Sequence, residues 1–218
     1  VGFAKDRLQR GRGALPFTTL ETLATIKGRE FPNQEELDRW YAANGITGEV
    51  RSAVSVQIPT FIDTAEDVVV CLDGATGNVL WERTAHEGKP RATVNRNNTY
   101  ASETPATDGE HVIAYFGNTG LSCYDFSGNL VWSKDLRVYP MQLGWGTGSS
   151  PLLYGNSVFI QCDNDQKSFL VALDKKTGDE LWRIDRDEKS NWSTPYIWKH
   201  KQRTELITAG GGKLRSYN

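Results

Sequence analysis

Residues 169–182 read FLVALDKKTGDELW, an apolar run that ends at Asp174, a Thr-Gly turn at Gly178 and a second run that ends in Trp182. Runs in which apolar side chains alternate form strands with one buried face. Glycine adopts the positive φ that a short hairpin loop needs, and an aspartate bonds the backbone amides of its own turn. This stretch therefore predicts a β-hairpin.

The hairpin is repeated along the chain. VVVCLDGATGNVLW occupies residues 68–81, LSCYDFSGNLVW occupies residues 121–132, and KLRSYN at residues 213–218 begins a fourth copy. Three residues recur in the complete copies: Asp73, Gly77 and Trp81, then Asp125, Gly128 and Trp132, then Asp174, Gly178 and Trp182. We expect each Trp to be a docking residue that packs against the next unit, because one sheet cannot bury both of its faces alone.

A second element precedes the hairpins. It begins with a hydroxyl residue and a proline, at Thr104-Pro105, Ser150-Pro151 and Thr194-Pro195, and continues into a turn and a strand. The three prolines lie 46 and 44 residues apart. Units of this length with four short strands are typical of β-propeller blades. The predicted fold class is therefore all-β, a β-propeller with four-stranded blades.

The number of blades is too small for a closed propeller, which has about four to eight. The sequence holds two complete repeats, one repeat without a recognisable inner strand, and one that stops at Asn218. The ring is incomplete, so we expect the chain to be a fragment whose remaining blades close it. The alternative is that another chain covers the exposed strand edges.

The third hairpin resembles the tryptophan-docking motif of the pyrroloquinoline-quinone (PQQ) propeller family. The resemblance is carried position for position by Ala172, Asp174, Thr177, Gly178 and Trp182. Cys71 replaces the alanine in the first copy, and the second copy has Cys123 there and Ser127 in a shorter turn. The resemblance covers roughly residues 65–218. In this region the chain is similar to bacterial PQQ-like repeat proteins, planctomycete ones included. It implies an exported, periplasmic or cell-envelope location, although no signal peptide is visible in this chain.

Residues 1–60 do not follow the repeat, so we predict a divergent segment at 1–60 and propeller blades at 61–218. A helix is predicted from Asn33 to Asn44, with acidic residues in its first turn and Gly45 as its left-handed stop. Residues 51–58 alternate, with Val54 and Val56 on one face, and predict a strand that remains from a first blade.

Composition excludes several classes of function. Twenty-five basic and 27 acidic residues give a net charge of −2, which provides no field for a nucleic-acid backbone. The longest apolar runs have about five residues, far fewer than the roughly 20 that span a bilayer. The three cysteines, Cys71, Cys123 and Cys162, lack CxxC spacing and are interpreted as core residues.

The resemblance does not extend to a cofactor site. PQQ-dependent dehydrogenases of this superfamily hold their quinone and a metal ion in the central channel, with an Asp as base. No Glu, Asn and Asp set here matches those ligands, so we expect neither a cofactor nor a metal. The histidines His86, His111 and His200 lack the spacing of metal ligands. Asp163-Asn164-Asp165 is interpreted as a turn. A solvated loop face is the interpretation of Asp185, Asp187, Glu188 and Lys189.

The loops before the inner strands contain the candidate binding residues. These are Arg96, Asn97, Glu103, Trp145, Lys189 and Trp192. Aromatic, amide and charged groups together suit a protein partner or a polar small ligand, although packing between blades would explain the same residues. The first hypothesis is a non-enzymatic binding scaffold. The alternatives are a dehydrogenase fragment whose PQQ and calcium ligands lie on missing blades, and a sensor ectodomain.

Overall fold

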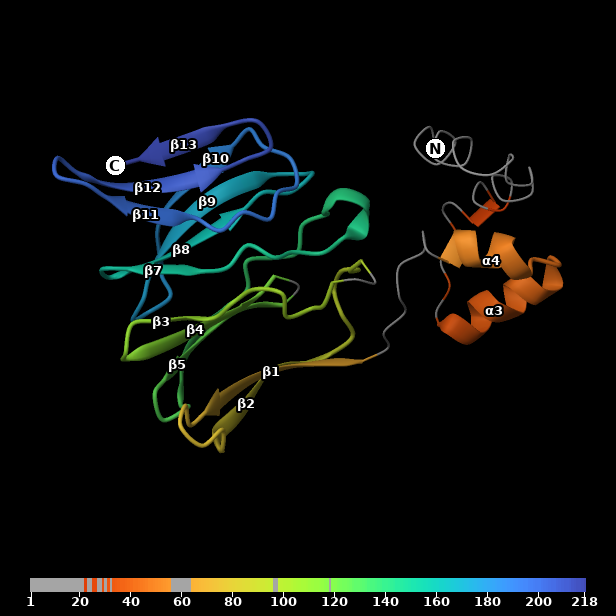
Figure 1. Ribbon diagram of the computed structural model, residues 1–218, viewed down its shortest axis with the longest axis horizontal. Coiled ribbons are helices and arrows are strands. Elements are labelled where there is room, and N and C mark those ends of the chain that lie inside the picture. Colours follow the sequence, from red (N-terminus) through yellow and green to blue (C-terminus); the bar gives the residue numbers. More distant parts are fainter. Residues whose placement is uncertain are drawn as a thin grey trace. The chain divides into compact units, whose positions relative to one another are not determined.

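The computed structural model describes residues 22, 25–26, 29, 31, 33–55, 64–95, 98–117 and 119–218. The chain divides into two compact units, Val1–Asp63 and Thr64–Asn218. In Figure 1 the described part of the first unit is helical and the second unit is built from strands.

The first unit contains helices α3 (Gln34–Ala43) and α4 (Gly48–Ser55). The Asn33 side chain caps α3 by accepting the backbone N–H of Glu36 at 2.9 Å. This cap satisfies one of the free amides at the helix start, which is why the chain turns helical here. The predicted helix at Asn33–Asn44 is confirmed. No helix among the described residues is long and apolar enough to cross a membrane.

The predicted strand at residues 51–58 is wrong for its described part. Residues 51–55 belong to α4, while residues 56–58, Val56 included, lie outside the described part of the chain. Val50 and Val54 are four residues apart and therefore share one face of a helix. Val54 is fully buried with Leu37 and Tyr41 in a small core, which favours the helix over the strand.

Two complete four-stranded sheets form the centre of the second unit. The first contains β3 (Ala106–Thr107), β4 (His111–Phe116), β5 (Gly120–Asp125) and β6 (Leu130–Lys134). The second contains β7 (Leu152–Tyr154), β8 (Ser157–Cys162), β9 (Ser168–Asp174) and β10 (Glu180–Arg186). Neighbouring strands are antiparallel and follow sequence order in both sheets. The predicted four-stranded propeller blade is therefore confirmed.

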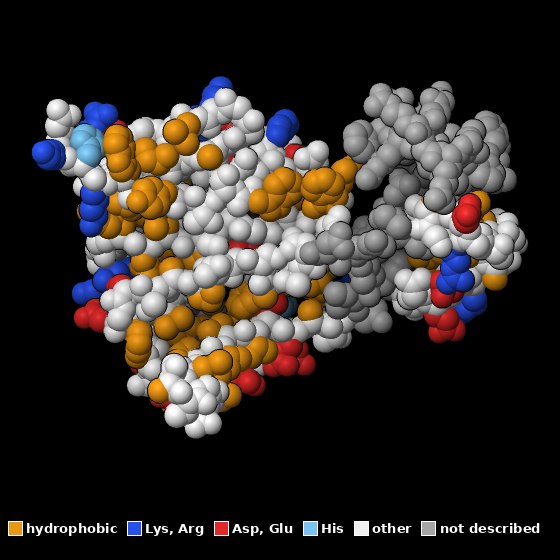
Figure 2. Space-filling view, viewed as in Figure 1, with side chains coloured by type: hydrophobic (Ala, Val, Ile, Leu, Met, Phe, Trp, Pro, Cys, Tyr) orange, Lys and Arg blue, Asp and Glu red, His pale blue; other side chains and the backbone are white. Residues whose placement is uncertain are grey.

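Partial blades flank the two complete ones. Before them lies a hairpin of β1 (Ala65–Leu72) and β2 (Val79–Gly88). After them lies a sheet of β11 (Tyr196–Lys199), β12 (Thr204–Ala209) and β13 (Leu214–Tyr217). Figure 2 shows hydrophobic side chains gathered over both of these end sheets. On these sheets Val79 of β2 is 59% exposed and Trp198 of β11 is 48% exposed, as expected for an incomplete ring.

The main core lies between the two complete blades. Ile113 and Leu121 of the first pack against Val158 and Phe169 of the second. Cys123 and Cys162 are buried in the same core, and burial raises the pKa of each thiol to about 12, so both are unreactive core residues. Cys71 is only half-buried, so the prediction that all three cysteines are core residues holds for two.

The repeated spacing of the hairpins along the chain produces a repeated contact between blades. Trp81 donates its Nε1–H to the Phe126 carbonyl of the next blade at 3.0 Å, and Trp132 donates to the Lys175 carbonyl at 2.8 Å. A Cβ added to Gly178 would lie 2.8 Å from the Trp132 ring. Glycine therefore provides the positive φ of the turn and also the flat surface on which the indole lies.

Candidate functional site

Three connections between blades meet at one end of the strands, and we call them the loop end. They are residues 89–105, of which 96 and 97 are not described, residues 135–151 and residues 187–195. Asn98 donates its side-chain N–H to the Trp145 carbonyl at 2.9 Å, and Trp192 donates its Nε1–H to the Gly146 carbonyl at 2.7 Å. The loop end is thus held together by bonds between connections from different blades.

The hydroxyl residues before the prolines add a second set of bonds between the connections. The Ser150 hydroxyl accepts the backbone N–H of Thr104 at 2.9 Å, and the Thr194 hydroxyl accepts the backbone N–H of Ser150 at 3.0 Å. The repeated Ser/Thr-Pro pair therefore links each inner-strand entry to the next. Proline cannot donate a backbone hydrogen bond, so the preceding residue supplies the donor.

A cavity of about 440 Å³ opens among the first two of these connections. Its wall includes Arg91, Thr93, Tyr100, Tyr139, Met141 and Thr147. Gly146 has a φ of +81°, and an added Cβ would lie 2.7 Å from Val94. The glycine-rich segment that follows Leu143 therefore allows the two connections to approach closely. The wall combines aromatic, aliphatic and hydroxyl groups, as small-molecule and peptide sites do.

The predicted binding residues do not all lie together. Trp145 and Trp192 come together, with ring centroids 5.9 Å apart at an interplanar angle of 33°. Glu103 is 7% exposed and lies behind the cavity wall. Lys189 lies apart from them and donates to the Asp165 carbonyl at 3.3 Å. The candidates Arg96 and Asn97 lie outside the described residues.

Glu103 is a buried carboxyl group beside the cavity. It accepts the backbone N–H of Gly117 at 3.3 Å and bonds the Thr147 hydroxyl, and these two partners line the cavity. Burial raises the pKa of Glu103, and the charge of Asp67 raises it further. Asp67 is 5% exposed, accepts the Thr119 hydroxyl at 2.7 Å, and also has a pKa raised by burial.

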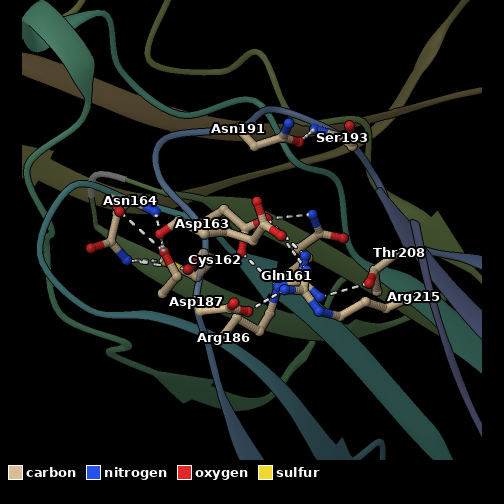
Figure 3. A network of polar contacts seen from close by, with 12 residues as sticks. Gln161, Cys162, Asp163, Asn164, Arg186, Asp187, Asn191, Ser193, Thr208 and Arg215 are labelled. Atoms are coloured by element: carbon tan, nitrogen blue, oxygen red, sulfur yellow. Dashed lines mark hydrogen bonds and ion pairs between the residues drawn. The ribbon is translucent and has the colours of Figure 1, made fainter. Parts of the chain in front are cut away.

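The sequence interpretation missed a buried ion pair at the loop end of the second complete blade. Arg186 donates from Nε and from a terminal nitrogen to the two carboxylate oxygens of Asp163, at 2.7 and 3.0 Å, and both side chains are 0% exposed. The same guanidinium also donates to the Thr208 hydroxyl at 2.6 Å, as Figure 3 shows. Asp163 follows β8 and Arg186 ends β10, so only the strand order brings them together.

The predicted solvated face of Asp185, Asp187, Glu188 and Lys189 also needs correction. Asp187 is largely exposed, but the Glu188 side chain is only 6% exposed and forms an ion pair with Arg215. Glu188 also accepts the backbone N–H of Gly211 at 3.0 Å. The Arg215 guanidinium lowers the pKa of the Glu188 carboxyl, since the pair favours its charged form.

Comparison with protein families gives one match, and it extends over more than half of the chain. The family described as outer membrane protein assembly factor BamB matches residues 34–191. The chain belongs to this family. The match includes the two complete blades, the β1–β2 hairpin and the helices α3 and α4. No curated protein matches the chain.

Solved structures with similar strands include BamB from Moraxella catarrhalis, at 20% sequence identity and a TM-score of 0.42. They also include the quinohemoprotein alcohol dehydrogenase ADHIIG from Pseudomonas putida HK5, at 21% identity and a TM-score of 0.38. The chain spans 39% of the length of the first and 20% of the second, while 69% and 58% of this chain are covered. Likeness at this level carries no argument about activity.

Among the described residues of this BamB-family chain, one group has the residue types of a metal site. Ligand atoms of Asp108, Glu110 and His111 lie within 4.8 Å of one another at the turn between β3 and β4. The Lys175 ammonium already donates to Asp108 at 2.6 Å. This pair and the backbone amides of the turn outweigh burial and hold the pKa of Asp108 well below its usual range. The Lys175 ammonium thus already provides the cation for this carboxylate.

Two buried carboxyl groups of the loop end, Asp163 and Glu103, do not fit the calcium ion that the PQQ resemblance implies. Arg186 occupies both oxygens of Asp163. Burial raises the pKa of Glu103 and so favours its neutral form, whereas a carboxyl group binds calcium as the carboxylate. We therefore derive no catalytic step from these residues.

Proposed function

We propose that this BamB-family chain is part of a non-enzymatic binding propeller, and that its loop end takes a protein partner or a polar ligand. The observation that carries the proposal is that three connections bonded to one another form the loop end, and that a cavity of about 440 Å³ opens among the first two of them. Loops that are already bonded to one another lose little conformational freedom on binding. A preformed surface of this kind suits recognition.

The surface offers groups that recognise peptides and polar molecules. Trp145 is 38% exposed next to Trp192, so an indole face is available for contact. Aromatic side chains contribute large contact area, and hydroxyl and backbone groups fix orientation. Tyr100 and Tyr139 add aromatic area in the cavity wall.

The test uses the full-length protein in its own host, with a photoreactive phenylalanine at position 145. We expect one recurrent adduct at this position, and its loss when Trp192→Ala removes the neighbouring ring. The same label at Lys176, on the exposed β9–β10 turn at the other end of the blade, is the matched control. Equal labelling at the two positions, or none at position 145, would count against the loop end as a binding surface.

The alternative function, a PQQ-dependent dehydrogenase, makes a different prediction. Absorbance spectra and calorimetric titration of the full-length protein with PQQ and calcium should show no stoichiometric binding under our proposal. Tight binding with a stoichiometry of one would support the dehydrogenase and would assign the ligands to blades beyond this chain.

We further propose a cell-envelope location, because the family is described as an outer membrane protein assembly factor. Fractionation of cells that express the full-length protein tests this location. Recovery in the cytoplasmic fraction alone would refute it.

A further inference from the structure

The turn between β11 and β12 differs in sequence from the turns at the same place in the two complete blades. The turn between the first two strands of the sheet is Asp108-Gly109-Glu110 in one blade and Gly155-Asn156 in the other, whereas here it is His200-Lys201-Gln202-Arg203. Turns favour Gly, Pro, Asn, Asp and Ser, and this one contains none of them. Departures from local sequence rules are expected chiefly at functional sites, so this turn is a candidate for one.

The β11–β12 turn carries an excess of positive charge on the surface. Lys199, Lys201 and Arg203 are exposed, and Figure 2 shows Lys, Arg and His side chains gathered at this end of the partial blade. In the described part of the chain, Glu205 is the one carboxylate that pairs with these three cations, and it binds Arg203 at 2.7 Å. Three cations against one carboxylate leave two positive charges in excess, in a chain whose net charge is −2.

The two lysines are presented on an ordered surface without an acidic partner among the described residues. The Lys199 ammonium lies 4.7 Å from the ring centroid of Tyr154, which is a cation–π contact with the neighbouring blade. The backbone N–H of His200 donates to the Arg203 carbonyl at 3.1 Å and closes the turn. The His200 ring also packs against Trp198, with centroids 4.6 Å apart. A cationic surface that is already ordered loses little conformational freedom when it binds an anion.

The number of charges decides which kind of anion fits this surface. Clusters that bind anionic lipids contain about four to eight Lys and Arg residues, and DNA-binding proteins contact on the order of six to ten phosphates. Three cations, one of which is already paired with Glu205, suit a few carboxylates instead. Tyr154 is 37% exposed beside Lys199 and offers apolar area next to the charge. We propose that the β11–β12 turn is a docking site for an acidic segment of a protein partner, whose carboxylates bind Lys199 and Lys201.

This docking site is separate from the loop end. Strand β11 begins after residues 187–195, which belong to the loop end, and runs to the turn, so the two surfaces lie at opposite ends of the strand. The neighbouring β9–β10 turn does not share the excess of charge. Its Lys175 pairs with Asp108 at 2.6 Å, and Asp174 lies beside Lys176. The inference therefore does not depend on the function proposed for the loop end.

Fluorescence anisotropy of the full-length protein with two labelled peptides tests the site. One peptide is rich in Glu, and the other has Gln at the same positions. We expect only the Glu peptide to bind, and its binding to weaken as salt is added. Lys201→Glu should weaken this binding roughly tenfold, because it replaces an attraction by a repulsion. Lys176→Glu makes the same change on the exposed β9–β10 turn and should leave the binding within about twofold.

A photoreactive phenylalanine at the exposed position Gln202 tests the site with the proteins of the host, and it keeps all three cations. The crosslinked segment of the partner should be acidic. Its adduct should be lost in Lys201→Glu and kept in Trp192→Ala, which alters the loop end alone. Four results would overturn the proposal: equal binding of the two peptides, equal losses for Lys201→Glu and Lys176→Glu, a crosslinked segment without an excess of acidic residues, or tighter binding to phosphatidylglycerol vesicles than to the Glu peptide.

Discussion

Alanine at Gly178 should destabilise the chain much more than alanine at Gly155 in the same blade. Both glycines have positive φ, at +75° and +61°. At Gly155 an added Cβ meets nothing within 4 Å, whereas at Gly178 it would lie 2.8 Å from two ring atoms of Trp132. The two variants therefore share the backbone strain and differ in the contact with the neighbouring blade.

The magnitudes follow from these two terms. A left-handed conformation costs an L-residue about 1–2 kcal/mol, and this is the expected loss at Gly155. Carbon atoms pack at roughly 3.5–4.0 Å, so the Trp132 ring must move away and strain its bond to the Lys175 carbonyl. Overpacking of this kind adds about 1–3 kcal/mol, which gives about 2–5 kcal/mol for Gly178→Ala.

The free energy of unfolding of each variant, measured in urea by circular dichroism, checks this difference. Indole fluorescence of the Gly178→Ala variant should also change in the native state, since Trp132 is only 8% exposed. Equal losses for the two variants would show that the glycine is needed only for its turn, and would remove the physical basis of the docking motif.

Three further outcomes concern other contacts. Trp132→Ala should cost about 3–5 kcal/mol, and Trp182→Ala less, because Trp182 is 37% exposed in this chain; urea unfolding ranks the two. Arg186→Met should cost about 3–5 kcal/mol by leaving Asp163 buried and unpaired, and a double-mutant cycle with Asp163→Leu should recover much of that loss. The folded pKa of Glu103 is raised, so its contribution to stability is present at acidic pH and is lost as pH rises through that pKa. Thermal unfolding across this range should show a smaller fall for Glu103→Gln than for the parent, by at most about 1.4 kcal/mol per pH unit.

The blades were predictable because their signals are local. The aspartate, the glycine and the start of the second strand all lie within about six residues of sequence. In the structure, Asp174 accepts the backbone amides of Lys176 and Thr177 at 2.8 and 3.1 Å. These bonds lower the pKa of Asp174, which agrees with a charged acceptor in the turn. The repeat then multiplies this local evidence along the chain.

The failures come from contacts that strand order creates. Asp163 and Arg186 are 23 residues apart, and neither lies in a pattern that indicates burial. A charged residue at a strand end is usually solvated, and only the neighbouring blade closes over this pair. The α4 error has a different origin, because a spacing that places Val54 and Val56 on one face of a strand does not exclude the helical pairing of Val50 with Val54.

The two ends of the blades therefore carry different constraints. At the hairpin end, Trp132 and Gly178 join neighbouring blades through one repeated contact, which fixes the spacing of the repeat. At the loop end, the hydroxyl residues before the prolines repeat one bond between connections, and the other contacts between blades are individual, such as Trp192 with Gly146 and Arg186 with Thr208. The hairpin contact and this hydroxyl bond recur from blade to blade, whereas the other contacts of the loop end do not. Sequence at the loop end can thus change from blade to blade while the fold is kept, which is the condition under which a binding surface can be built there.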